Sequence, residues 1–104
     1  MKTDYCSIIP HDEISGSFLK YFERMLSNSG FEKSFEHRDP GGVDVYRYQN
    51  SKAQIIVVTC TQLQADKDEL KISSEWSDLK GLVEKAADSF GDEIARMIKK
   101  GRKD

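Results

Sequence analysis

The chain has 104 residues, of which 38% are hydrophobic and 33% charged, a composition typical of one globular domain. Its 16 basic and 18 acidic side chains give a net charge of −2, which excludes a strongly basic nucleic-acid binder and a polyacidic mimic of nucleic acid. The longest apolar run, residues 55–58, is far shorter than the ~20 residues that span a bilayer, so no membrane partner is expected. The first residues lead into no apolar signal segment, and we therefore expect a cytoplasmic protein.

The first predicted elements are a short strand and a helix. Residues 4–9 form the strand or an ordered arm, which Pro10 ends because it lacks an N–H group. Apolar residues then recur at three- and four-residue steps, which predicts an amphipathic helix with Asp12 as its N-cap and Gly30 just beyond its end. The apolar face of this helix is formed by Ile14, Phe18, Phe22, Met25 and Leu26.

After Gly30 the hydrophobic period changes from helical to two, which is typical of strands. Residues 31–37 are the first of these strands, and their core face is expected to carry Phe31, Lys33, Phe35 and His37. Residues 38–42 are a turn, and residues 43–49 are a second strand. Residues 53–61 are apolar on both faces and should lie at the centre of the sheet, whereas Leu70 and Ile72 indicate a short fourth strand at its edge.

The last pattern predicts one long helix from Trp76 to Ile98, with Ser74 or Ser77 as N-cap and Gly91 kinking or splitting it. Short turns between the strands favour an antiparallel meander. We therefore predict one α+β domain over residues 1–104, in which three or four antiparallel strands carry the N- and C-terminal helices on one face. The order is α-β-β-β-(β)-α, and residues 99–104 are expected to be a frayed basic tail.

No motif predicts a catalytic residue, a metal site or a cofactor. Cys6 and Cys60 are expected to be small, half-buried hydrophobes or to bridge neighbouring strands. A small enzyme that uses His37 or Cys60 in a cleft closed by the helices remains an alternative, but it needs a nucleophile and a base within hydrogen-bonding reach.

The segment Tyr46-Arg47-Tyr48 is the leading candidate for binding another protein. Tyrosine and arginine are enriched at interface hot spots. If the helices cover the face of Val43 and Val45, both tyrosines lie on the open face of the sheet. Ordinary cross-strand packing of the tyrosines and the stacking of single-stranded RNA bases on them are the alternatives.

Charge is unevenly distributed near the end of the chain. Residues 64–93 contain nine acids and four lysines, a net charge of −5, and residues 94–103 contain five basic residues and no acid. This distribution complements a helix macrodipole, or it forms an acidic band for a basic partner. Within the band we select Asp66, Asp68 and Glu69 as partner-binding residues.

In length and α+β layout the chain is similar to small bacterial immunity or antitoxin proteins, and less closely to secretion chaperones. The expected function is therefore a cytoplasmic protein-binding module that neutralises a partner, such as a basic nuclease toxin. Its partner-binding residues would be Tyr46, Arg47, Tyr48, Asp66, Asp68 and Glu69. A chaperone-like binding protein, the small enzyme and a weak single-stranded RNA binder remain alternatives, although the net charge of −2 argues against nucleic acid as a partner.

Overall fold

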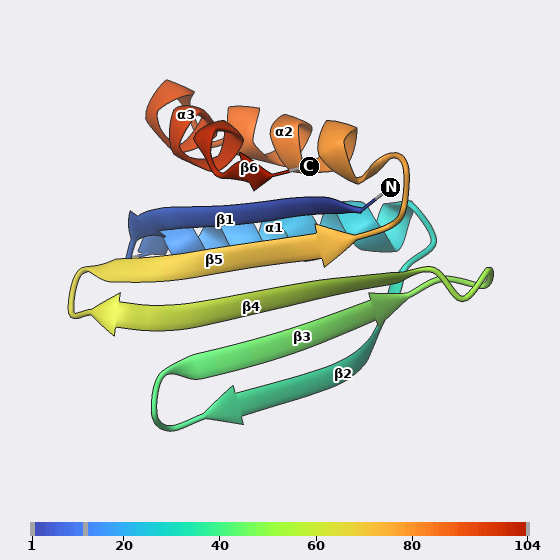
Figure 1. Cartoon of the computed structure of the whole chain (residues 1–104), viewed down its shortest axis with the longest axis horizontal. Helices are drawn as coiled ribbons and strands as arrows, with labels where there is room; N and C mark the ends of the chain where they lie inside the picture. Colours follow the sequence, from blue (N-terminus) through green and yellow to red (C-terminus); the bar gives the residue numbers. More distant parts are fainter. Residues whose placement is uncertain (1, 12, 104) are drawn as a thin grey trace.

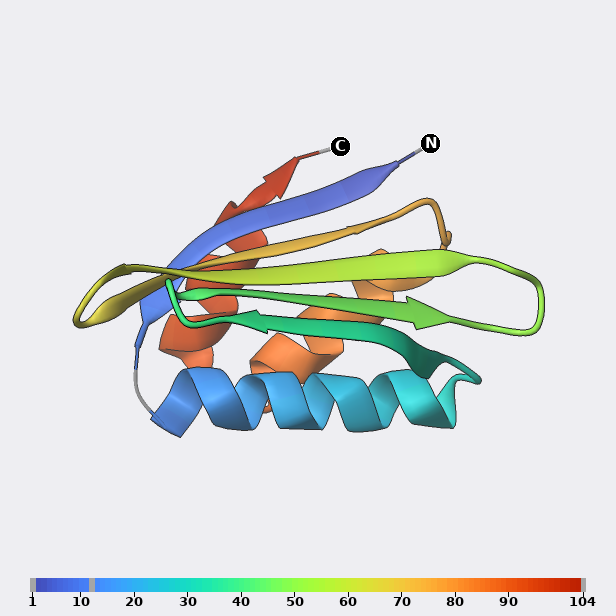
Figure 2. The ribbon, with the colours of Figure 1, turned by 90° about the horizontal axis from the view of Figure 1, so that it is seen from below.

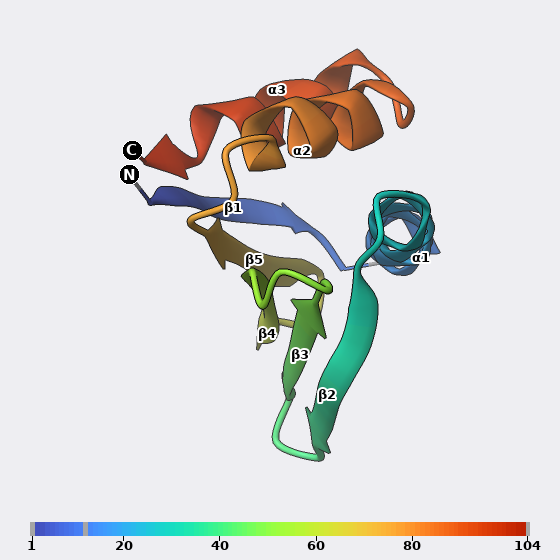
Figure 3. The same ribbon diagram turned by 90° about the vertical axis from the view of Figure 1, so that its right-hand side faces the viewer.

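The computed structural model describes residues 2–11 and 13–103, without the side chains of residues 13–15 and 103. In this part of the chain, six antiparallel strands form one sheet in the order β2-β3-β4-β5-β1-β6, and three helices lie on one side of it (Figure 1, Figure 3). The strands are β1 (Thr3–Pro10), β2 (Glu32–Asp39), β3 (Val43–Gln49), β4 (Ile55–Gln64), β5 (Lys67–Ser74) and β6 (Arg102–Lys103). The helices are α1 (Glu13–Asn28), α2 (Leu79–Asp88) and α3 (Asp92–Lys100). The predicted α+β class, with antiparallel strands and helices on one face, is confirmed.

Strand β5 is central, and the prediction that it lies at an edge is wrong. It pairs with β4 on one side and with β1 on the other. The N-terminal segment forms a complete strand beside β5, and β6 adds two further residues opposite Asp4 and Tyr5. The strand signal around Leu70 is weak because only two of the four buried positions of β5, Leu70 and Ile72, are apolar, and the other two are Asp68 and Ser74.

The predicted C-terminal helix is two helices. Gly91 separates them at a φ of 103°, a conformation that glycine adopts readily and other residues rarely do. The first of the two begins later than expected, at Leu79. Ser74 does not cap it, because the Ser74 hydroxyl donates to the Ile55 carbonyl at 2.7 Å and accepts from the Trp76 N–H at 3.0 Å. Asp12, the expected cap of α1, lies outside the described residues.

A β-bulge in β2 changes which of its side chains share a face. Lys33 pairs with Tyr48, but Phe35 pairs with Arg47, so Ser34 is the extra residue. After the bulge, the odd-numbered residues point away from the helices. The prediction of a core face in this strand is therefore wrong: Phe31 is buried just before β2, and all eight residues of the strand are exposed.

The core lies between the helices and the face of the sheet that they cover. Phe18, Phe22 and Leu26 of α1 are at most 1% exposed and meet buried residues of the sheet and of α2 and α3. The buried sheet and C-terminal residues include Tyr5, Ile56, Val58, Leu70, Ile72, Val83 and Ile98. Each such side chain contributes roughly 1.5–3 kcal/mol when it leaves water. None of the described helices is long and apolar enough to cross a membrane.

Candidate functional site

The face of the sheet opposite the helices is uncovered in the described part of the chain (Figure 2, Figure 3). We call it the open face. The pairing of the strands assigns to it Phe35, His37, Val43, Val45, Arg47, Ile55, Val57, Thr59, Thr61, Glu69, Lys71, Ser73, Asp4, Cys6 and Ile8. Three large apolar side chains on it are strongly exposed: Ile8 at 53%, Phe35 at 46% and Ile55 at 43%. These three side chains lie on three different strands, β1, β2 and β4, so the open face is apolar at separate points.

The pair formed by Arg47 and Phe35 is the most distinctive feature of the open face. The guanidinium carbon of Arg47 lies 5.6 Å from the centre of the Phe35 ring, within the range of a cation–π contact. Val45 and His37 are paired two residues further along the same strands. Sequence reasoning selected Arg47 but missed Phe35, because the unbroken alternation of residues 31–37 had assigned that ring to the core.

The tyrosines do not lie on the open face, and the expectation that they do is wrong. Tyr48 is only 4% exposed and its hydroxyl donates to the carboxylate of Glu23 in α1 at 2.7 Å. Burial, together with the neighbouring Glu23 carboxylate, raises the pKa of Tyr48 well above its usual range. Tyr46 is half-buried against the core, and the ammonium of Lys33 lies 5.6 Å from its ring centre. The helices cover the tyrosine side of β3, which leaves the valine side open.

The three acids selected as partner-binding residues do not form one patch. Asp68 is only 3% exposed and faces the helices, where both carboxylate oxygens lie 2.9 Å from Nδ1 of His11. Glu69 lies on the open face, with its carboxylate 3.5 Å from the ammonium of Lys71. Asp66 is exposed in the β4–β5 turn, where its carbonyl accepts the His11 N–H at 2.9 Å. Neighbouring residues of a strand point to opposite faces, which separates Asp68 from Glu69.

The basic residues near the C-terminus lie against the acids that precede them. Lys99 is 2.8 Å from the carboxylate of Asp88, and Arg102 is 3.8 Å from that of Glu84. Residues 99 and 100 belong to α3, and residues 102 and 103 form β6, so this part of the expected frayed tail is regular structure. Part of the charge separation seen in the sequence is thus neutralised within the fold.

The two residues proposed for catalysis lie on opposite faces of the sheet. His37 is exposed on the open face in β2, and Cys60 is half-buried on the helix-covered face in β4. The pKa of the Cys60 thiol is raised to about 12. Burial is the largest cause, and the carboxylates of Asp68 and Asp44 add to it. A nucleophilic cysteine needs the opposite shift, because the thiolate is the reactive form. No group of three or more His, Cys, Asp or Glu side chains in the described residues could hold a metal ion.

The cysteines are both free, and β5 lies between the two strands that carry them. Cys6 belongs to the open face and Cys60 to the helix-covered face. A bridge between neighbouring strands, one of the two expectations, is therefore not formed.

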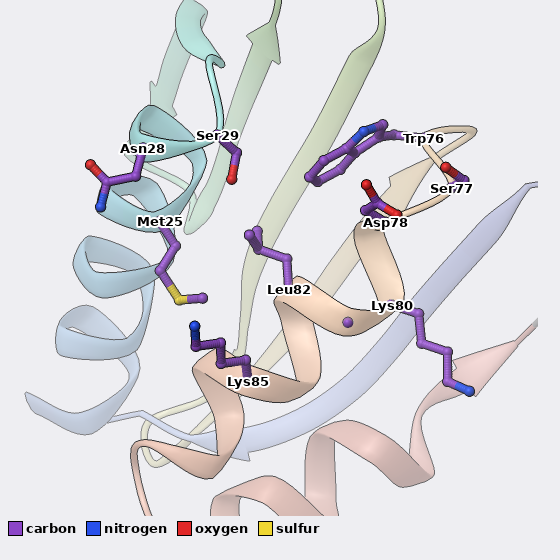
Figure 4. A pocket seen from close by; sticks show the side chains of 10 residues that line it. Met25, Asn28, Ser29, Trp76, Ser77, Asp78, Lys80, Leu82 and Lys85 are labelled. Carbon is purple, nitrogen blue, oxygen red and sulfur yellow. The ribbon is translucent and has the colours of Figure 1, made fainter.

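A groove of about 620 Å³ lies between the end of α1 and the start of α2 (Figure 4). Met25 and Leu82 point into it from the two helices, and Trp76 lies at its other end (Figure 4). The Trp76 ring also packs on Phe31, with ring centres 4.8 Å apart, so it has a structural role in closing the core. The groove is a second concave surface, but the polar groups around it belong to side chains of mixed charge and define no particular ligand.

Comparisons with known proteins give no assignment. No family model matches the chain, and no curated protein matches it at a significant level. The function must therefore be argued from the geometry described above.

Proposed function

We propose that this chain is a cytoplasmic protein-binding module that docks on another protein through the open face, and that it acts as an inhibitor of the immunity or antitoxin kind. The observation that carries this proposal is the exposed Arg47–Phe35 pair within a surface of β-branched side chains. Arginine and aromatic residues are enriched in protein interfaces, where a few buried residues carry most of the binding energy and their neighbours exclude water.

The recognition would use side chains on the face rather than the edge of the sheet. The sheet has two edges: β1, where β6 pairs with only Asp4 and Tyr5, and β2, which is an edge over its whole length. Strand β2 is interrupted by the bulge at Ser34 and carries charged residues along its length, including Lys33, Glu36 and Arg38. Bulges and edge charges are the devices that discourage strand addition. Docking through the side chains of the open face does not require strand addition, so neither the bulge nor the edge charges of β2 obstruct it.

The alternatives lose support from the same geometry. An enzyme based on Cys60 would have to ionise a thiol that lies beside two carboxylates. An enzyme based on His37 would work on an open strand surface, where bulk water can reach the reacting groups and the advantage of a water-excluded site is lost. The base-stacking alternative depended on both tyrosines, and Tyr48 is buried.

The test is affinity purification of the tagged chain from its source cells, comparing wild type with the double variant Phe35→Ser/Arg47→Ser. Hot-spot residues typically contribute 2 kcal/mol or more each, so a partner should be retained by the wild type and lost by the double variant. The matched control is Arg24→Ser/Arg96→Ser, which removes two exposed basic side chains on the helices α1 and α3, away from the open face. Equal recovery of the partner with both variants would contradict the proposal.

The charge of the partner is tested separately. Asp66 and Glu69 are the two selected acids with accessible side chains, and a basic partner would meet them at the end of the open face. Reversing both to lysine should slow association, and the loss should shrink at high salt. An unchanged association rate would contradict a basic partner, but it would not contradict the proposal that the chain binds a protein through the open face.

A further inference from the structure

The strand register arranges the open face in rows that cross the sheet. One row contains Arg47, Val57, Ser73 and Asp4, on β3, β4, β5 and β1 in that order. The next row contains Val45, Thr59, Lys71 and Cys6, and the third contains Val43, Thr61, Glu69 and Ile8. The midline of the six-stranded sheet runs between β4 and β5.

A two-fold axis along this midline relates the face to itself in a complementary way. Rotation about the axis places β3 of one copy over β1 of the other, and β4 over β5, while each row stays at the same height along the strands. Arg47 then faces Asp4 of the second copy, and Val43 faces its Ile8. The charged position meets an opposite charge, and the apolar position meets an apolar one.

We propose that two copies of this chain pack open face to open face about this axis, as a dimer that forms when no other partner occupies the surface. A C2 interface requires a surface that complements itself, and the rows above have this property. Two aligned sheets pack about 10 Å apart with their strands rotated by about 30°. This rotation displaces a residue from the one it faces by roughly one strand spacing at most.

The size of the face suits such a dimer. Four strands of seven to ten residues overlap under this axis and cover about 19 Å by 26 Å, or roughly 500 Å² in plan, at the usual strand spacing and rise. Side-chain relief increases the accessible area toward the ~800 Å² per partner of a standard interface. A monomer would leave Ile8 about half exposed, and the dimer would cover it with Val43 of the second copy, whereas Phe35 on β2 would lie opposite β6.

The charged residues near the two-fold axis determine how tightly we expect the dimer to associate. Glu69 and Lys71 lie 3.5 Å apart on β5 and would face Thr61 and Thr59 of the second copy. Their partial desolvation opposes association, whereas the threonine hydroxyls can donate to the carboxylate and accept from the ammonium. We therefore expect a reversible dimer that a heterologous partner can displace, which would make self-association a regulator of the proposed binding function.

A charge exchange tests the geometry by sedimentation velocity over a concentration series. Arg47→Asp and Asp4→Arg should each weaken the dimer about tenfold or more, because each removes two facing charge pairs and creates two repulsions. The double exchange Arg47→Asp/Asp4→Arg should restore the dimer to within a few-fold of wild type. Arg96→Asp, the same charge change on exposed α3, should leave the dimer unaffected.

Chemical cross-linking gives a second test that does not depend on charge. Val45 and Cys6 lie three strands apart in one chain, about 14 Å, but would face each other across the two-fold axis. Val45→Cys treated with a short bis-maleimide should give a covalent dimer, and adding Cys6→Ser should abolish it.

The regulatory role of the dimer rests on the proposed binding function, but the dimer and the binding function can fail separately in these experiments. A wild-type chain that stays monomeric at millimolar concentration overturns the dimer, as does a double exchange no better than the single variants. Loss of a partner on Phe35→Ser/Arg47→Ser would still support the binding module in that case. Suppose instead that the charge exchange and the cross-link both give the expected dimer, while Phe35→Ser/Arg47→Ser still binds its partner. That result would support the dimer and overturn the binding module.

Discussion

The substitution of glycine by alanine should have opposite effects at two positions in this chain. Gly101 follows α3, where it packs against β1, and the Cys6 N–H donates to its carbonyl at 2.8 Å. A Cβ at Gly101 would meet the Ser7 hydroxyl and would lie 2.5 Å from the Cys6 carbonyl oxygen. Gly16 lies inside α1, and a Cβ there would meet no atom within 4 Å.

The magnitudes follow from these contacts. Carbon–oxygen contacts are normally no closer than about 3.3 Å, so Gly101→Ala must push the C-terminal segment away from β1. Overpacking of this kind costs about 1–3 kcal/mol, and weakening the hydrogen bonds of Cys6 and Ser7 adds roughly 1 kcal/mol. The free energy of unfolding should therefore fall by about 2–4 kcal/mol. Gly16→Ala should raise it by about 0.5–1 kcal/mol, because alanine loses less backbone entropy in a helix and nothing obstructs it.

Urea unfolding monitored by circular dichroism measures both changes. The midpoint should move down for Gly101→Ala and up for Gly16→Ala, with the slope m unchanged for each. The reasoning is refuted if Gly101→Ala lies within about 0.5 kcal/mol of wild type, since a steric effect of this size cannot relax away without cost. Destabilisation by Gly16→Ala would show that α1 is constrained by contacts absent from the structure.

Three further substitutions probe polar groups under the helices. Tyr48→Phe removes the 2.7 Å hydrogen bond to the Glu23 carboxylate and should lower the free energy of unfolding by about 1.5–3 kcal/mol, measured by urea titration. His11→Ala leaves the nearly buried Asp68 carboxylate without its imidazole partner and should lower it by roughly 1–3 kcal/mol, so an unchanged urea midpoint would contradict the importance of this pair. The raised pKa of Cys60 means that the unfolded chain loses this thiol proton at lower pH than the folded chain. The stabilising contribution of the protonated thiol is therefore complete below about pH 8.5 and declines as the pH rises toward 12. The difference in the free energy of unfolding between wild type and Cys60→Ala should shrink between pH 8 and pH 10. A difference that stays constant over this range would count against the raised pKa.

The helices show what hydrophobic period can predict. The three- and four-residue steps located α1 and the core residues Phe18 and Phe22. The same period ran through Gly91 because α2 and α3 each bury an apolar face, and period alone cannot reveal a change of direction between two helices. The glycine was the available signal, and its positive φ is the physical reason for the break.

The strands show where prediction fails. Alternation correctly separated Val43, Val45 and Arg47 from the two tyrosines, but it could not determine which set the helices cover. That choice depends on contacts distant in sequence between the helices and the sheet, of which the hydrogen bond from the Tyr48 hydroxyl to Glu23 of α1 is one. The bulge in β2 is likewise invisible to alternation, and it moved Phe35 from the expected core to the candidate site.

The position of β1 has a consequence for how the chain folds. Thr3 pairs with Ser74 and Pro10 with Lys67, so the two strands are separated in sequence by more than half the chain. Strand β1 therefore cannot pair until β5 has formed. The hairpins β2–β3, β3–β4 and β4–β5 can form from local contacts, whereas β1 can be inserted only after a large loop has closed. Such non-local pairing slows folding. Until it occurs, the edge of β5 remains unpaired, and an unpaired strand edge can pair with the wrong segment or with another chain.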